Sequence, residues 1–488
     1  MNTNPIPRRD FIKATGALGL GLGAWSRLAV ATDSKQNAQL PNIIVYISDD
    51  HGVLFAEPYG NQEIHTPNLQ QLADEGTTFN QAFCVSPCCG PSRSAMFTGL
   101  WPAKNGAEPN HMRPKPGLQG LPGVLKSLGY ETAAIGKVTH GGWEPMYEFD
   151  FFVGPRSGKK DLEDASKYLA NRDASKPLCL FFGAHFPHTP WVENTEYDSD
   201  KLTMPPTLVD TPVMREEHAK YCSSVTATDT LLGDFRELVN KHVPGEQLFI
   251  YTSDHGAQFP FAKWDLYDAG IRVPFIGVWP GHLQPGTTSE ATICLPDLLP
   301  TLIELSGGEV PEGLDGQSFA GVLTGEKTTH RECSFATQSG DSDCNVYPSR
   351  SLRTRDWKYI LNLHPEFQHH TFITRYVKED AGQVYWKTWL EAAKTDPTAA
   401  AIVQRHTIRP AEELYDLNAD PHELHNLATD PEHAERLANM RAELREWMAS
   451  QGDNETVFGR PLLIGEPVTL LTTKQVQDAL PKQKRRNI

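Results

Sequence analysis

The 488-residue chain has fewer basic than acidic residues, and this shortage restricts its partners. It contains 45 Lys and Arg against 61 Asp and Glu, which gives a net charge of -16. General nucleic-acid binding depends on Lys and Arg that neutralise phosphates, so we expect no nucleic-acid partner. An anionic substrate is still allowed, because a local cationic pocket can outweigh the global charge.

The sequence also lacks an N-terminal apolar run long enough to span a membrane. Residues 14–28 are apolar, but this run is short, rich in Gly and Ala, and interrupted by Arg27. It follows Arg8-Arg9-Asp10-Phe11-Ile12-Lys13 and precedes the small residues 29–31. This order resembles a twin-arginine export signal, which is read by a receptor and is not an anchor. We predict a signal peptide over residues 1–34, recognition by the twin-arginine export machinery, a periplasmic or secreted protein, and no stable membrane insertion.

Paired cysteine motifs are missing as well. The eight cysteines include no CxxC pair and no zinc-ligand spacing. In an oxidising compartment Cys333 and Cys344 could form a disulfide, although the sequence does not fix the connectivity. The chain also contains no internal repeat.

What the chain does contain is an alternation of strands and helices. Apolar, β-branched runs predict strands over residues 42–47, 131–135, 178–183, 247–252 and 273–278. Helices are expected over residues 69–75, where Thr66-Pro67-Asn68 supplies the cap, and over 120–128, 215–240 and 431–449. This order predicts an α/β fold with a large, mostly parallel sheet flanked by helices.

The length suits one large α/β domain and a smaller second one. From about residue 350 the pattern changes, and residues 351–361 predict antiparallel strands. We predict a catalytic domain over residues 35–345, a C-terminal α+β subdomain over 346–475, and a basic tail over 476–488.

Polar side chains gather where the predicted strands end. Asp49 and Asp50 follow the first strand, and Asp254 and His255 follow the fourth; Lys137 and His188 lie after two others. Ligands of parallel α/β sheets bind beyond the carboxyl ends of the strands. Adjacent aspartates repel each other unless something compensates, and three carboxylates with one imidazole suit a hard divalent cation. Each acidic pair taken alone could equally be a turn or helix-cap cluster.

Cys89 precedes a predicted helix start. Pro91 and Ser92 favour the first turn of a helix, and the free amides of such a turn attract anions. A thiol there should be acidified, exposed and reactive. For Cys-x-Pro alone, a buried cysteine beside a helix cap is the plainer alternative.

The full string from Cys89 to Gly99 is more specific. The string has the pattern Cys-x-Pro-Ser-Arg, followed by three variable residues, an apolar residue and Thr-Gly. This string resembles the signature of the type I, formylglycine-dependent sulfatase family. The resemblance implies an alkaline-phosphatase-like fold with a large mixed sheet. It also implies that a formylglycine-generating maturation enzyme oxidises Cys89 to formylglycine, whose hydrate becomes the nucleophile.

The resemblance also implies roles for individual residues. The metal ligands would be Asp49, Asp50, Asp254 and His255, joined by the modified Cys89, around one divalent cation, with Ca²⁺ favoured over Mg²⁺. The sulfate oxygens would be held by Arg93, Lys137 and Lys263. His188 would protonate the departing alcohol or amine. His140 would remove a proton from the second hydroxyl of the nucleophile, which expels sulfate and restores the aldehyde. Taken alone, Lys137 and Lys263 could be surface lysines, and His140 a packed histidine.

Two features depart from the commoner family pattern. His140 follows Lys137 by three residues rather than two, and His255 stands where many members have Asn. Both features resemble iduronate-2-sulfatase-like bacterial sulfatases, whereas Asn105-Gly106 and residues 259–261 resemble heparan N-sulfatase. The mixture implies a sulfatase acting on a sulfated polysaccharide or glycosaminoglycan, with O-sulfate and N-sulfate both open.

Two alternatives are a phosphonate monoester or phosphodiester hydrolase of the same superfamily, and a non-catalytic glycan-binding homologue. The intact Cys89, Arg93 and metal-ligand positions disfavour the non-catalytic one.

Overall fold

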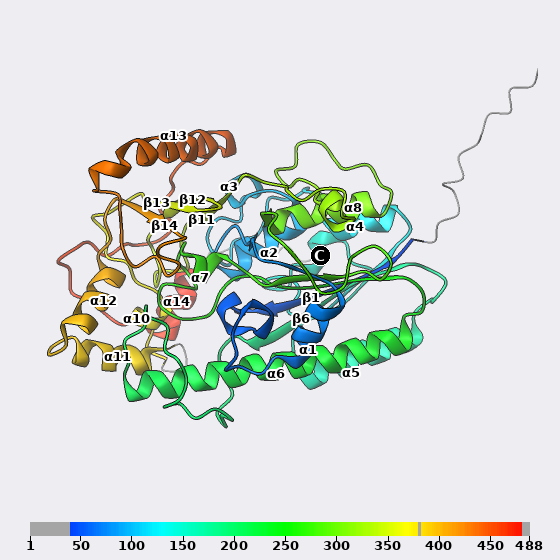
Figure 1. Cartoon of the computed structure of the whole chain (residues 1–488), viewed down its shortest axis with the longest axis horizontal. Helices are drawn as coiled ribbons and strands as arrows, with labels where there is room; N and C mark the ends of the chain where they lie inside the picture. Colours follow the sequence, from blue (N-terminus) through cyan, green and yellow to red (C-terminus); the bar gives the residue numbers. More distant parts are fainter. Residues whose placement is uncertain (1–39, 379–381, 481–488) are drawn as a thin grey trace, which may run out of the picture. The chain divides into compact units, whose positions relative to one another are not determined.

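The computed structural model describes residues 40–378 and 382–480 (Figure 1). The predicted signal peptide, residues 1–34, lies outside the described residues, as do residues 481–488 of the predicted basic tail. Residues 476–479 of that tail belong to helix α14 (Thr473–Ala479).

The main sheet has eight strands in the order β5-β4-β6-β1-β7-β8-β2-β9. Strand β1 lies at its centre and pairs in parallel with β6 and β7, while β8 runs antiparallel to both β7 and β2. The predicted large, mixed, mostly parallel sheet is therefore confirmed. The bounds are β1 Asn42–Asp49, β2 Thr77–Phe79, β4 Glu131–Gly136, β5 Phe151–Val153, β6 Leu178–Pro187, β7 Gln247–Ser253, β8 Phe275–Val278 and β9 Thr287–Ser289; β3 (Ala82–Phe83) and β10 (Ile293–Cys294) form a small separate pair.

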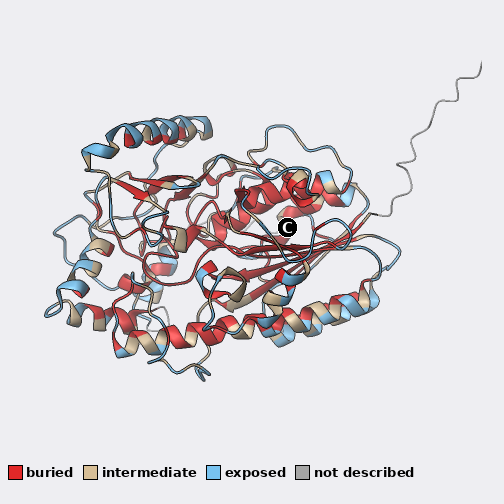
Figure 2. Ribbon diagram, viewed as in Figure 1, coloured by how far each residue is buried: buried red, intermediate tan, exposed pale blue. Residues whose placement is uncertain are grey.

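Both faces of the sheet are covered, which is why its strands read as continuous apolar runs. Along β1 the side chains of Ile43, Val45 and Ile47 join one core cluster, and those of Ile44 and Tyr46 join another. Helices α2, α4 and α8 pack on the first face, and α1, α5 and α6 on the second. Figure 2 shows the buried strands between these layers. The helix bounds are α1 Pro67–Glu75, α2 Cys89–Thr98, α3 Pro102–Asn105, α4 Leu121–Ser127, α5 Gly158–Asn171, α6 Pro212–His242, α7 Asp268–Ile271, α8 Leu298–Leu305 and α9 Ala320–Leu323.

Helix α1 begins at Pro67, but its cap differs from the predicted one. The Thr66 hydroxyl accepts a hydrogen bond from the Glu57 amide instead. The free amides of Asn68 and Leu69 donate to the carboxylate of Asp229, at 3.0 and 2.7 Å. A carboxylate at a helix N-terminus satisfies these amides and complements the helix dipole. The cap therefore comes from α6.

The C-terminal part contains an antiparallel sheet in the order β11-β12-β13-β14, as predicted for residues 351–361. Leu352, Tyr359 and Leu414 pack against Leu444 of α13 in a core cluster of their own. The predicted boundary between residues 345 and 346 stays a prediction. The bounds here are β11 Cys333–Gln338, β12 Ser349–Thr354, β13 Trp357–Asn362, β14 Glu412–Asp416, α10 Phe372–Arg375, α11 Gln383–Ala392, α12 Pro397–Thr407 and α13 Ala434–Gln451.

Two further predictions bear on cysteines and membranes. All eight cysteines lie within the described residues and carry free thiols, Cys333 and Cys344 included. Among the described residues, no helix combines the length and apolarity needed to cross a bilayer.

Candidate active site

The site forms where β1 and β7 end side by side. These strands run parallel with Ser48 opposite Ser253, so the residues that follow each strand lie next to each other. Asp49 ends β1, and Asp50 takes a left-handed backbone conformation (φ 66°) that turns the chain sharply. The Asp50 amide donates to Asp254 Oδ1 at 3.1 Å, which links the two acidic pairs. All four residues of the two pairs, including His255, are buried.

Arg93 connects the two strand ends to helix α2. Its Nε lies 2.8 Å from Asp254 Oδ2, and its Nη2 lies 3.2 Å from Asp49 Oδ1. The guanidinium also donates to the Val138 carbonyl at 3.1 Å. Arg93 lies four residues after Cys89, which is about one helical turn. The guanidinium that binds the two aspartates therefore also fixes the position of the start of α2.

Cys89 is the first residue of α2 and lies at the centre of this arrangement. Its Sγ is 3.2 Å from His255 Nε2, 3.6 Å from Asp49 Oδ1 and 3.8 Å from Lys137 Nζ. The residue is only 2% exposed, and burial raises the pKa of its thiol well above the usual value. The prediction of an exposed, acidified thiol is therefore wrong. Desolvation outweighs the helix terminus and the nearby lysines, so a cysteine here is a poor nucleophile.

Neither predicted lysine is a surface side chain: Lys263 is buried, and the side chain of Lys137 is 12% exposed. Lys137 forms an ion pair with Asp49 Oδ2, and Lys263 Nζ lies 2.7 Å from Asp50 Oδ2 and 3.0 Å from Gln258 Oε1. Burial opposes the charged forms, yet the carboxylates raise the pKa of both lysines. Burial likewise opposes ionisation of Asp49, but Lys137, with His188 and Arg93, holds its pKa well below the usual value. In this cluster, Asp49 and the two lysines are therefore charged, whereas burial raises the pKa of Asp50 despite the opposing charge of Lys263.

The donor set of this cluster fits a hard divalent cation. Two groups of side chains bring possible ligand atoms within 4.8 Å of one another. The first group is Asp49, Asp50, Cys89 and His188, and the second is Cys89, Asp254 and His255. Asp50 Oδ1 is buried and accepts no hydrogen bond from the described residues. His255 Nδ1 donates to the Gly256 carbonyl at 3.0 Å, which leaves the Nε2 lone pair facing Cys89 and Asp50.

The predicted histidines His188 and His140, and the neighbouring His185, occupy different parts of the site. His188 Nδ1 donates to the Thr189 carbonyl at 2.6 Å, so Nε2 is the ring nitrogen free for another partner. His185 Nδ1 lies 3.6 Å from Asp49 Oδ2. His140 is buried, and its Nε2 lies 2.7 Å from His111 Nδ1. Burial lowers the pKa of His140 and His188 well below the usual value, so both rings are neutral.

A cavity of about 270 Å³ opens above Cys89. The C-terminal part contributes one wall of it, where Trp264 and Phe372 stack with ring centroids 5.8 Å apart. Sequence reasoning named Cys89, Lys137, His140, His188 and Lys263 from this lining. It missed the rest, most of which lie outside helices and strands: Asn110, His111, Gln258, Asp341, Tyr376 and Lys378, among others.

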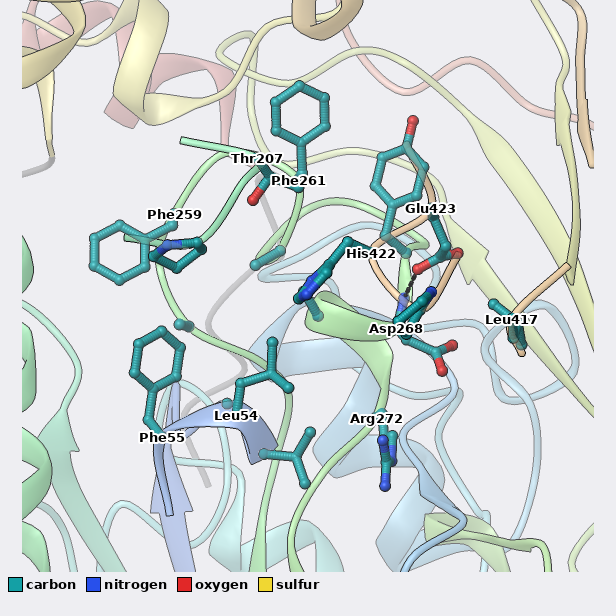
Figure 3. A pocket seen from close by; sticks show the side chains of 18 of the residues that line it. Leu54, Phe55, Thr207, Phe259, Phe261, Asp268, Arg272, Leu417, His422 and Glu423 are labelled. Atoms are coloured by element: carbon teal, nitrogen blue, oxygen red, sulfur yellow. Dashed lines mark hydrogen bonds between the residues drawn. The ribbon is translucent and has the colours of Figure 1, made fainter. Parts of the chain in front are cut away.

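A second cavity, of about 200 Å³, is lined in part by Ala257 and residues 259–262 but shares no lining residue with the first. In Figure 3 the apolar side chains of Leu54, Phe55 and Phe259 lie on one side of it, and Asp268 and Glu423 on the other. Glu423 accepts a hydrogen bond from the Asp268 amide at 2.6 Å. None of the predicted site residues lines this cavity.

Comparison with known families decides the class of the chain. The model of the Sulfatase family matches residues 41–308, which is more than half of the sequence. The chain belongs to the sulfatase family. The resemblance drawn from residues 89–99 is thereby confirmed, and it places the chain among sulfuric ester hydrolases. A second model, that of the N-sulphoglucosamine sulphohydrolase C-terminal region, matches residues 255–375 of this sulfatase.

Relatives of the sulfatase extend over almost all of its length. An ulvan-active sulfatase of Formosa agariphila is 31% identical over 480 residues, which cover 92% of each chain. Human N-sulphoglucosamine sulphohydrolase is 28% identical over 458 residues, which cover 83% of this chain and 89% of the human protein.

Solved structures share the fold of the sulfatase. One, in complex with its substrate D-glucosamine-2-N,6-O-disulfate, superimposes with a TM-score of 0.65 at 21% identity, and the match covers 85% of this chain and 99% of that one. A phosphonate monoester hydrolase of Agrobacterium radiobacter gives 0.63 at 17% identity, covering 84% and 96%. At such identities the likeness concerns the fold alone.

Proposed function

We propose that the chain is an exported sulfatase that removes sulfate groups from a sulfated glycan, with residue 89 converted to formylglycine and one divalent cation bound. One observation carries this proposal. The side chain of residue 89 lies among three carboxylates, His255 and two lysines, at the base of a polar cavity. A buried thiol with a raised pKa is unsuited to this position, whereas a hydrated aldehyde provides hydroxyl groups there.

Asp49, Asp50, Asp254, His255 and residue 89 would hold the cation. When bound, the cation would polarise a sulfate oxygen and lower the pKa of a hydroxyl on residue 89. Three of the four protein ligands besides residue 89 are carboxylates, a set that suits Ca²⁺, with Mg²⁺ as the alternative.

The charges of the site support an anionic substrate. Three cationic side chains balance the carboxylates of Asp49, Asp50 and Asp254. Arg93 pairs with Asp49 and Asp254, Lys137 with Asp49, and Lys263 with Asp50. A divalent cation would add two positive charges and compete for the same carboxylates. The lysine ammonium groups would then be free to bind the sulfate oxygens, and Lys137, Lys263 and Arg93 would offset the charge that grows in the transition state.

Two neutral histidines fit the proton transfers. His188 Nε2 carries no proton while the ring is neutral, so it would first take up a proton as the anionic substrate binds beside it. His188 shares a ligand group with Asp49, Asp50 and Cys89, and we assign to its charged form the protonation of the leaving oxygen or nitrogen. His140, on another wall of the cavity, is the base that accepts a proton from residue 89.

The relatives and the cavity support a saccharide substrate. The relatives include an ulvan-active sulfatase and an N-sulphoglucosamine sulphohydrolase. Trp264, Phe372 and Tyr376 provide aromatic surface in the cavity, and Lys378 adds a cationic group. Aromatic faces with a nearby cation suit a sugar ring that carries anionic groups.

Maturation and export would follow a fixed order. Cys89 is 2% exposed in the folded chain, so a formylglycine-generating enzyme needs the chain before it folds. Twin-arginine signals are read by machinery that exports folded proteins. The oxidation of Cys89 would therefore precede export to the periplasm or beyond.

The test is a substrate panel with released sulfate measured directly. It contains ulvan oligosaccharides, D-glucosamine-2-N,6-O-disulfate, a 6-O-sulfated N-acetylglucosamine and phenyl phosphonate, with Cys89→Ala as the matched control. Sulfate release from a saccharide that disappears in the folded Cys89→Ala variant supports the proposal. Turnover of phenyl phosphonate alone would assign the phosphonate hydrolase activity, and no turnover of any compound would favour a glycan-binding homologue.

A further inference from the structure

His140, His111 and Asp341 form a chain of polar contacts. His140 Nε2 lies 2.7 Å from His111 Nδ1, and His111 Nε2 lies 3.4 Å from Asp341 Oδ1. All three residues line the catalytic cavity, and Asp341 and His140 are buried. The chain therefore runs from a buried carboxylate, through one imidazole, to the proposed base.

The orientation of the Asp341 carboxylate is fixed by two donors on the same oxygen. Trp264 Nε1 and Asn110 Nδ2 both donate to Oδ2, at 2.8 and 2.9 Å. Among the described residues, Oδ1 has no hydrogen-bond partner, and the His111 ring lies beside it with Nε2 at 3.4 Å. The carboxylate plane thus presents Oδ1 to His111 Nε2.

The protons of both imidazoles can be assigned from these contacts. His111 Nε2 lies 3.4 Å from Asp341 Oδ1 and 3.4 Å from Asn110 Nδ2, which already donates to Asp341 Oδ2. An ionised carboxylate only accepts hydrogen bonds and is the stronger partner, so we assign the proton to His111 Nε2. A neutral ring has one proton, which leaves a lone pair on His111 Nδ1 to accept from His140 Nε2. The lone pair of His140 is then on Nδ1. That atom is buried, and no described residue provides a hydrogen-bond partner for it.

The same network contacts the residue that follows Cys89. Asn110 Oδ1 accepts a hydrogen bond from the Gly90 amide at 2.9 Å while its Nδ2 binds Asp341. A Cβ at Gly90 would lie 3.5 Å from His140 Cδ2, so the His140 ring packs against the first turn of α2. Asp341 thus aligns both the base and the helix that carries residue 89.

We propose that His111 and Asp341 are positioning residues that hold His140 in the tautomer whose Nδ1 accepts a proton from residue 89. The inference rests on the proposed function for its chemical step. In that step His140 Nδ1 takes the proton of a hydroxyl on residue 89, and the electrons of the O–H bond form the C=O bond. The bond from the same carbon to the sulfate oxygen breaks, and sulfate leaves with its electron pair. The positive charge on His140 is stabilised through His111 by Asp341.

The tautomers can be measured without substrate, cation or formylglycine. In the full chain with ¹⁵N-labelled histidine, we expect the nitrogen shifts of both His140 and His111 to show a protonated Nε2 and a bare Nδ1. In Asp341→Asn, the donors Trp264 and Asn110 would hold the new amide oxygen in the place of Oδ2. The amide NH₂ would then take the place of Oδ1 and face His111. Both rings would then switch their proton to Nδ1. Asp343→Asn is the matched control, because Asp343 Oδ1 accepts from the Arg460 amide outside this network, and it should leave both rings unchanged.

Kinetics provide the second readout. General acid–base catalysis contributes about 10²–10⁴-fold, so we expect kcat of Asp341→Asn to fall by about 100-fold or more while KM changes little. A pair of variants at His111 keeps the proposal testable should Asp341→Asn not fold. His111→Asn can place its amide oxygen where His111 Nδ1 lies, so His140 keeps a hydrogen-bond acceptor. His111→Gln has a longer side chain that reaches toward Asp341 and leaves His140 without that acceptor. We therefore expect a higher kcat for His111→Asn than for His111→Gln.

The outcomes separate this inference from the proposed function. Unchanged histidine tautomers in Asp341→Asn, or equal kcat in His111→Asn, His111→Gln and the wild type, would overturn it even for an active sulfatase. The expected tautomers in a protein that releases no sulfate would contradict the proposed function but support the positioning of His140 by His111 and Asp341.

Discussion

Arg93 Nε lies 2.8 Å from Asp254 Oδ2, and this contact joins the helix that begins at Cys89 to the end of β7. The same guanidinium reaches Asp49 at the end of β1. One buried side chain therefore aligns the start of α2 with both acidic pairs.

Replacement of Arg93 should destabilise the fold as well as the site. Arg93→Met leaves two buried carboxylates without their guanidinium, and breaking such a pair costs about 3–5 kcal/mol of unfolding free energy. Urea unfolding in the presence of a chelator measures the loss. Arg236→Met is the control, because Arg236 pairs with the partly exposed Glu75 and should cost less than about 1 kcal/mol. Equal losses for the two variants would contradict the account.

Cation binding should stabilise the protein through Asp254. At a free calcium concentration about 100-fold above Kd, a single site adds about 2.7 kcal/mol of unfolding free energy. Thermal unfolding with and without chelator should show this shift in the wild type and not in Asp254→Asn. Asp229→Asn removes another buried carboxylate, the cap of α1, and should lower the Tm while keeping the calcium-dependent shift. A calcium response that persists in Asp254→Asn would exclude this site.

Lys263 should act in turnover. Removing one preorganised charge from a transition state costs about 10²–10³-fold in kcat, and we expect a loss of that size in Lys263→Met. Sulfate release from the best saccharide of the panel is the measurement. Lys104→Met, which removes an exposed partner of Asp315, should keep wild-type kcat. A loss of kcat smaller than about threefold in Lys263→Met would contradict this role, because removing a preorganised charge costs far more.

Acid should weaken the fold through buried histidines. Burial lowers the pKa of His218 to about 4 and of His370 to about 3, below the unfolded value of about 6.5. Below pH ~6.5 the unfolded chain binds more protons, so stability is lost as the pH falls from there toward 4. Each ring accounts for about 2 kcal/mol between pH 7 and pH 5.

Urea unfolding at both pH values checks this. Between pH 7 and pH 5, the unfolding free energy of His218→Phe should fall by about 2 kcal/mol less than that of the wild type, because the variant has no ring to protonate at this position. His425→Phe, at an exposed ring, should leave the difference unchanged. An unchanged pH dependence in His218→Phe would show that this ring is not held neutral.

Much of the fold could be predicted because its signals are local. The apolar run of β1 is buried on both faces, and its boundaries follow from composition. The cap of α1 could not be predicted, since Asp229 is 161 residues from Asn68 in the sequence. Nothing in the local sequence shows which distant carboxylate meets a helix terminus.

The residues of the site also divide into those that the local sequence predicts and those that it does not. Asp49, Asp50, Asp254 and His255 follow strands, so the parallel-sheet rule brings them together. His111 and Asp341 lie in loops, and Asp341 meets Asn110 across 231 residues of sequence. The thiol of Cys89 was predicted to be acidified because the helix terminus is visible in the sequence, whereas its burial depends on the whole fold.

The central claim is that residue 89 is not cysteine in the working enzyme. Peptide mass spectrometry of active, exported protein tests it most directly. We expect the peptide containing residue 89 to be lighter by the change from thiol to aldehyde, in proportion to the sulfatase activity of each preparation. Full activity in protein whose Cys89 peptide is entirely unmodified would contradict the account.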